Sequence, residues 1–152
     1  LVVYVPHVVI RMISKESEAK ALTAGSLRMK HKKCTVMCTS VSNFAKISGA
    51  LSRIELLTVM DCYLQQTNDV IQELGGIFNN FEGDRIVVFW TQDVDVTGGE
   101  HSLMACDAAD MLKVAIEELN DSWQDYGLDP TLKLELNIGI ATSDCLVGNY
   151  GT

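Results

Sequence analysis

A single carboxylate, Asp84, stands directly after the glycine of a predicted tight turn, in the segment FNNFEGDRIVVFW (78–90). Two short apolar runs, 77–81 and 85–91, flank that turn and predict a β-hairpin. A hairpin holds its turn residues at a defined point, so a carboxylate there could act on a ligand or a reacting group. Gly-Asp is also ordinary turn chemistry, and this second interpretation stays open.

The cysteines and histidines do not form a recognisable metal motif. The chain has five cysteines and three histidines, with no CxxC pair and no histidine beside a cysteine in sequence. A zinc site is therefore not expected. Cys38, Cys62 and Cys106 stand among apolar neighbours, which predicts small buried side chains in a reducing compartment. We expect the chain to be cytoplasmic.

Composition limits the classes of function. The 152 residues are 47% hydrophobic and 21% charged, which is typical of one globular domain with a sizeable core. A net charge of −8 argues against a nucleic-acid partner. The basic run RMKHKK (28–33) is interpreted as a solvated lead into the first strand, with a phosphate-steering patch as the alternative.

No membrane span is expected, because no apolar run approaches the roughly 20 residues that a spanning helix needs. The apolar opening segment LVVYVPHVVIRMI is interrupted by His7 and Arg11, and it lacks the features of a signal peptide. The first residue is not methionine, which predicts a segment of a longer protein.

Predicted strands and helices alternate along the chain. In order they are a strand (33–41), a helix (52–74), the hairpin, a loop (91–100), a helix (101–126) and two strands (132–142 and 145–151). Ser52 and Glu55 form a capping box at the start of the first helix, and Gly75 ends it. The aromatic residues Tyr63, Phe81 and Trp90 are expected to pack against other side chains rather than to stack on a nucleotide base, and His101 is expected to begin the second helix.

This order predicts an α+β fold of the ferredoxin-like type, in which helices flank a mainly antiparallel sheet. Residues 1–32 are expected to form a leading helix or connector, and residues 33–152 the domain itself.

Several segments, in the same order and spacing, resemble the class III nucleotide cyclases, the catalytic domain of adenylate and guanylate cyclases. The resemblance covers nearly the whole chain, and the matching segments are YVPHVV, CTVMCTSVSNFAKIS, GGIFNNFEGD, HSLMACDAADML and NIGIATSDCLVGNYG. GGIFNNFEGD, for example, is similar to the family pattern G-G-x-x-x-K-F-x-G-D. The resemblance implies a class III cyclase fold.

The resemblance also implies a role for Asp84. These enzymes drive the ribose 3′-hydroxyl onto the α-phosphate and expel pyrophosphate, with two metal ions that neutralise the phosphates. Mg²⁺ prefers hard oxygen ligands, and one carboxylate comes from the first strand while the other comes from the hairpin. Asp84 falls on the hairpin position, whereas Ser40 stands where the first aspartate belongs. A hydroxyl cannot replace an anion between two Mg²⁺ ions, so we expect a degenerate member of the family.

Other departures concern the nucleotide. Asn80 stands where the family usually has a lysine that reads the purine of adenine-specific enzymes, which leaves ATP and GTP both open. Asn137, Ala141 and Ser143 replace the usual arginine, asparagine and glycine.

The loop at 40–45 could still face an anion through its backbone N–H groups, and the residues implied there are Val41, Asn43 and Phe44. Asn43 stands in place of the usual glycine. We expect Mg²⁺ or Mn²⁺ as a cofactor only if nucleotide binding is retained. The family's transition-state asparagine and arginine follow GNYG, and the chain ends at Thr152 before them, so we expect the C-terminal part of the domain to be missing.

These features leave more than one function open. The chain could be a catalytically degenerate domain that serves as a dimerisation, structural or regulatory partner of a second cyclase-type domain or a larger assembly. It could be one half of an active heterodimer that makes cAMP or cGMP, since the metal-free half of paired cyclases also carries serine at the position of Ser40. It could bind ATP or GTP as a sensor without cyclising it.

Overall fold

The central strand of the sheet, β1 (Lys30–Val41), pairs with β4 (Leu136–Val147) along its whole length and with β3 (Arg85–Thr91) on its other side. The computed structural model describes residues 30–91 and 100–147. Strand β2 (Ile77–Glu82) completes the order β2-β3-β1-β4, and every pair is antiparallel, as expected. The α+β fold class predicted from the order of elements is therefore confirmed.

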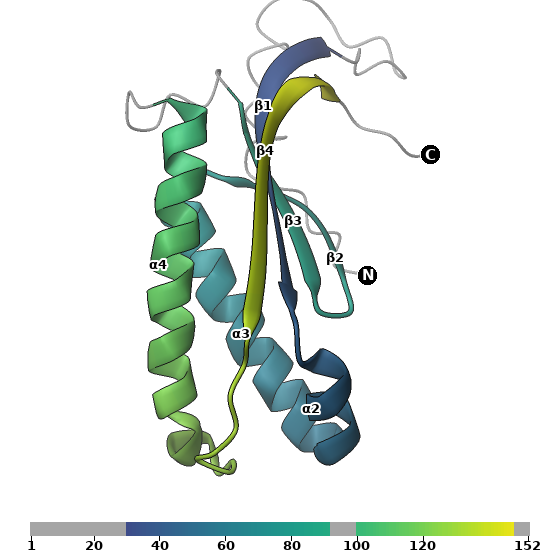
Figure 1. The fold of residues 1–152 in the computed structure, drawn as a ribbon, viewed down its shortest axis with the longest axis vertical. Coiled ribbons are helices and arrows are strands. Elements are labelled where there is room, and N and C mark those ends of the chain that lie inside the picture. The colour runs from purple at the N-terminus through teal and green to yellow at the C-terminus, as the bar shows by residue number, and fades with distance from the viewer. Residues whose placement is uncertain (1–29, 92–99, 148–152) are drawn as a thin grey trace, which may run out of the picture.

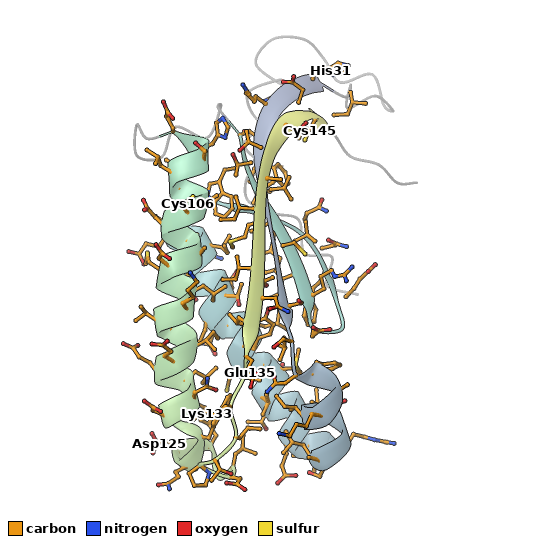
Figure 2. The ribbon with its side chains drawn as sticks, in the orientation of Figure 1. His31, Cys106, Asp125, Lys133, Glu135 and Cys145 are labelled. Atoms are coloured by element: carbon orange, nitrogen blue, oxygen red, sulfur yellow. The ribbon has the colours of Figure 1, made fainter. Side chains whose placement is uncertain are left out.

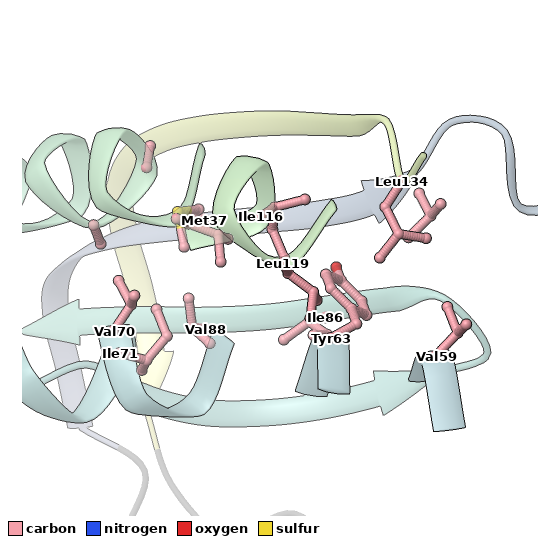
Figure 3. Close-up of a cluster of buried hydrophobic side chains, with 14 of the residues drawn as sticks. Met37, Val59, Tyr63, Val70, Ile71, Ile86, Val88, Ile116, Leu119 and Leu134 are labelled. Atoms are coloured by element: carbon pink, nitrogen blue, oxygen red, sulfur yellow. The ribbon is translucent and has the colours of Figure 1, made fainter. Parts of the chain in front are cut away.

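Two long helices, α3 (Arg53–Glu73) and α4 (His101–Asp121), lie on one face of this sheet (Figure 1). The core forms between them and the sheet, as Figure 3 shows in close-up. Its labelled members include Tyr63, Val70 and Ile71 from α3, Ile116 and Leu119 from α4, and Met37, Ile86 and Val88 from the strands. Burying each such side chain stabilises the fold by roughly 1.5–3 kcal/mol.

The start of α3 follows the predicted capping box. The Ser52 N–H donates to Glu55 Oε2 at 2.8 Å, and the Glu55 N–H donates to Ser52 Oγ at 3.3 Å. These bonds satisfy two backbone donors that the first turn of a helix leaves unpaired. The helix ends before Gly75, whose φ of +67° suits glycine. A short helix, α2 (Phe44–Ala50), precedes α3.

The predicted second helix ends earlier than expected. Instead of continuing to Tyr126, α4 stops at Asp121, and a separate 3₁₀ turn covers Trp123–Tyr126. The buried Asn120 explains the break. Its amide donates to Leu134 O at 3.0 Å, and its Oδ1 accepts the N–H groups of Leu134 (2.7 Å) and Trp123 Nε1 (3.3 Å). These bonds tie the helix end to the segment that leads into β4, and Trp123 turns into the core.

The prediction of two final strands is also wrong for the described residues. Residues 136–147 form one uninterrupted strand, because β1 offers a pairing partner from Val41, opposite Leu136, to Lys30, opposite Val147. Residues 132–135 do not join the sheet, since the backbone of Leu134 bonds to Asn120 instead.

At its other end β1 begins at Lys30, three residues before the predicted start at 33 and inside the expected connector. The rest of that connector (1–29), most of the predicted loop at 91–100 and the end of the segment 145–151 lie outside the described residues. Within residues 30–91 and 100–147, no helix has the length and apolarity required to cross a membrane.

Candidate functional site

Asp84 is placed by the turn between β2 and β3. Gly83, with φ of +63°, makes this tight turn. Asp84 is half-buried, and its Oδ2 accepts the backbone N–H of Val41 at 2.9 Å. The carboxylate therefore lies against the last residue of β1, which brings the hairpin aspartate and the end of the first strand together.

Ser40 lies at the same end of the sheet, on the face away from the long helices. Its neighbours Thr39 and Val41 are buried at 0% and 3% exposure, and Thr39 bonds to Tyr63 of α3, so both point towards the helices. Because side chains alternate along a strand, Ser40 points to the opposite face, where it is half-buried opposite Asn137.

Behind the site, Thr39 Oγ1 and Tyr63 Oη form a hydrogen bond of 2.7 Å between β1 and α3. Burial raises the pKa of Tyr63 to about 12, and the nearby charges of Asp84 and Cys38 act in the same direction, whereas the bond to Thr39 lowers it. The phenol therefore stays neutral and links the strand end that carries the site to the core.

The loop after β1 is fastened to the segment before β4. Ser42 N donates to Glu135 O at 2.7 Å. The Asn43 amide donates to Lys133 O at 2.8 Å, and its Oδ1 accepts the Glu135 N–H at 3.3 Å. Figure 2 labels Lys133 and Glu135 on the segment that rises into β4. The sequence alone did not predict these contacts. The Asn43 side chain, which the resemblance implies for nucleotide binding, is hydrogen-bonded to this segment instead.

The other residues implied for nucleotide binding have different surroundings. The Val41 side chain is buried and its N–H is bound to Asp84, while Phe44 is half-buried against the core. Asn80 is exposed on β2, opposite Val87 and next to a bulge between Phe78 and Asn80. Since β3 lies between β2 and β1, Asn80 is separated from Ser40 by a strand.

The aromatic predictions have mixed outcomes. Tyr63 and Trp90 are fully buried, and Trp90 Nε1 donates to Leu74 O at 2.9 Å. Phe81, however, is 39% exposed on the edge strand and does not belong to the buried core. Phe81 lies on β2, which has no neighbouring strand on its outer side among the described residues. His101 begins α4, as expected, and its Nδ1 lies 2.6 Å from Thr35 Oγ1.

At this end of the sheet, Asp84 supplies a carboxylate and Ser40 supplies a neutral hydroxyl. Among residues 30–91 and 100–147 no group of three or more His, Cys, Asp or Glu side chains is placed to hold a metal ion. Divalent cations such as Mg²⁺ need oxygen ligands and enough negative charge to offset dehydration. Of Asp84 and Ser40, only Asp84 supplies such a charge.

Comparison with solved structures gives consistent neighbours. The guanylyl cyclase Cya2 matches with a TM-score of 0.70 at 28% identity, over 82% of this chain and 60% of that one. The adenylyl cyclase CyaB from P. aeruginosa matches with a TM-score of 0.66 at 26% identity, over 83% and 63%. A bacterial light-regulated adenylyl cyclase matches with a TM-score of 0.76 at 17% identity, over 98% and 40%. This chain thus spans less than two thirds of the length of each of these structures.

Comparison of the sequence with protein-family models and with curated proteins finds no match.

Replacing Asp84 should destabilise the fold even in the absence of metal. In Asp84→Ala the Val41 N–H loses its acceptor, so we expect the free energy of unfolding to fall by about 1–2 kcal/mol in urea denaturation with a chelator present. Asp84→Asn keeps an oxygen acceptor and should lose less than half as much. The exposed Asp107→Ala is the control, and equal stabilities of Asp84→Ala and wild type would contradict this role.

Tyr63 should make the stability depend on alkaline pH. Its pKa is about 12 in the folded chain and about 10 in an unfolded chain. The stabilisation from the neutral phenol is thus fully present below about pH 10 and is lost as the pH rises to about 12. In urea denaturation, wild type should lose up to roughly 3 kcal/mol across that range relative to Tyr63→Phe. Parallel pH curves for the two proteins would refute this assignment.

Proposed function

Because the chain has the fold of the class III adenylyl and guanylyl cyclase catalytic domains, we propose that it is a degenerate cyclase homology domain. It no longer cyclises a nucleotide by itself and acts as the structural or regulatory partner of a second cyclase-type domain. The observation that carries the proposal is that the end of β1 bears the hydroxyl of Ser40, while the adjoining hairpin turn bears the carboxylate of Asp84, where the reaction would require two carboxylates.

The Val41–Asp84 bond supports this proposal by explaining why an aspartate persists without a second carboxylate. An acceptor at this turn satisfies a backbone donor at the end of β1. A half-buried N–H without an acceptor would cost on the order of 1–3 kcal/mol. Asp84 therefore has a structural reason to remain after the reaction is lost.

The open face of the sheet supports a partner role. In the described part of the chain the long helices cover one face, while Val36, Val87 and Phe89 are half-buried on the other. Side chains that are apolar and partly exposed over several strands are typical of an interaction surface. A second domain of the same fold, in the same chain or another, is the partner that we propose for this surface.

Any nucleotide contact that survives would use the exposed amide of Asn80 and the backbone at Val41, Asn43 and Phe44, with Mg²⁺ or Mn²⁺ bound together with the phosphates. We place this domain in the cytoplasm, because all five of its cysteines are free.

A cyclase assay tests the proposal. The chain is incubated with ATP and, separately, with GTP, each with Mg²⁺ and with Mn²⁺, and wild type is compared with Asp84→Ala. We expect no product in any of these conditions. Metal-dependent product that disappears in Asp84→Ala would show that Asp84 still serves the reaction.

The alternative, one half of an active heterodimer, is tested by adding a catalytically competent cyclase domain to the same assay. Activity that requires both proteins would favour the heterodimer over a purely structural role.

A further inference from the structure

Two thiols outside the candidate site share a cavity on the open face of the sheet. Cys34 on β1 and Cys145 on β4 both line a cavity of about 180 Å³, with apolar walls that include Val36, Val87 and Phe89. Cys34 is 1% exposed and Cys145 is half-buried. Figure 2 labels Cys145 where β4 curves beside β1, at the end of the sheet far from α2.

The strand register makes the two cysteines diagonal neighbours on one face. Cys34 is opposite Ser143, and Cys145 is opposite Lys32. Residues directly opposite in an antiparallel pair share a face, as do residues two apart along a strand. Both cysteine side chains therefore project from the same side of the β1–β4 pair.

The thiols also lean towards each other. Cys34 Sγ donates to Lys32 O at 3.6 Å, and Lys32 is level with Cys145 on the next strand. Cys145 Sγ donates to Ser143 O at 3.7 Å, and Ser143 is level with Cys34. Each sulfur is thus displaced along its own strand towards the level of the other cysteine, so the two sulfurs converge between the strands.

The electrostatics of Cys34 agree with this convergence. Burial raises the pKa of its thiol, and the neighbouring Cys145 raises it further, both by its charge and as a hydrogen-bond partner, while Lys32 acts in the opposite direction. The Cys145 side chain is therefore near enough to Cys34 to influence the protonation of the Cys34 thiol.

We propose that Cys34 and Cys145 form a reversible disulfide that links the edge strand β4 to the central strand β1 when the chain meets an oxidised thiol such as glutathione disulfide. The cavity shares Val36, Val87 and Phe89 with the proposed partner surface. The disulfide does not require the cyclase-partner function, because it is tested on the chain without a partner.

The geometry selects this pair from the five cysteines. Cys38 is on the same face of β1 but four residues from Cys34, which is about 13 Å along a strand. Cys62 and Cys106 belong to α3 and α4, on the other side of the sheet. A thiol at any of those positions cannot reach Cys34 or Cys145 without unfolding.

The reaction balances as a thiol–disulfide exchange. The more exposed Cys145 thiolate attacks glutathione disulfide, forms a mixed disulfide and releases one glutathione. Cys34 then loses its proton to solvent and attacks the Cys145 sulfur, which forms the Cys34–Cys145 bond and releases the second glutathione. Two protein thiols are oxidised, and one glutathione disulfide is reduced to two thiols.

The bond is expected to be labile. Diagonal neighbours have Cα atoms about 7–8 Å apart, whereas disulfides usually join Cα atoms about 4.4–6.8 Å apart. Closure therefore requires the curved ends of β1 and β4 to approach slightly, and a strained disulfide is reduced more easily than a relaxed one. This is the kind of disulfide that forms transiently in a reducing compartment.

The test uses the wild-type chain under native conditions. The protein is equilibrated with glutathione disulfide, free thiols are blocked, and peptides are mapped by mass spectrometry. We expect one linked pair of peptides, carrying Cys34 and Cys145, with the loss of two hydrogen atoms and full reversal by excess reduced glutathione. Glutathione that remains on Cys145 without closure, or linkage through Cys38, Cys62 or Cys106, would overturn the proposal.

Two variants and a matched control test the order of attack. Cys34→Ser should stop at the mixed disulfide on Cys145, and Cys145→Ser should leave Cys34 unmodified. Cys38→Ser, on the same strand face, should form the Cys34–Cys145 link at the wild-type rate. If circular dichroism shows that Cys34→Ser is unfolded, the wild-type peptide map and the Cys145→Ser variant still test the proposal. Persistent oxidation of Cys34 in Cys145→Ser would contradict the mechanism.

Discussion

The alternation of side chains along β1 determines where each functional group of this domain can lie. The strand is paired on both sides, so its register is held by β3 and by β4. Its odd-numbered side chains from Thr35 to Val41 meet the helices, and its even-numbered side chains from Cys34 to Ser40 meet the open face. A shift of one residue would move every one of them to the wrong side. The bond from Thr39 to Tyr63 helps to hold this register.

The candidate site is built from the end of that strand and from one turn. The hairpin brings the carboxylate of Asp84 to the backbone of Val41, the last residue of β1. Ser40, next to Val41, adds a hydroxyl without charge at the same strand end. One fold can carry different chemistries, so any activity depends on side chains such as these. The side-chain amide of Asn43 binds the backbone of the segment at 133–135 and so fixes the loop after β1.

Much of the fold could be predicted from the sequence where local signals agree with tertiary structure. The capping box at Ser52 and Glu55, the glycine at the end of α3 and the hairpin around Gly83 are local devices, and all were predicted correctly. The end of α4 could not be predicted, because it depends on the bonds between Asn120 and the backbone of Leu134. These two residues are separated in the sequence by the 3₁₀ turn and a connecting segment. The continuity of β4 likewise depends on the length of β1 rather than on its own residues.

Of the candidate site, the sequence could indicate the positions of Asp84 and Ser40 but not what each side chain contacts. The bond between Asp84 and Val41 joins residues 43 positions apart, so no local sequence pattern predicts it. The roles assigned to Val41, Asn43, Phe44 and Asn80 in nucleotide binding stay predictions.

Titration of the chain with Mn²⁺, followed by electron paramagnetic resonance, tests most directly whether the site lacks a second carboxylate ligand. Wild type is compared with Ser40→Asp, and Ser143→Asp on the same sheet face is the control. We expect weak binding or none in wild type and in the control. In Ser40→Asp, where a second carboxylate joins Asp84, affinity should rise at least about tenfold, or about 1.4 kcal/mol. Two tightly bound Mn²⁺ ions in the wild-type chain would contradict the proposal that this domain is degenerate.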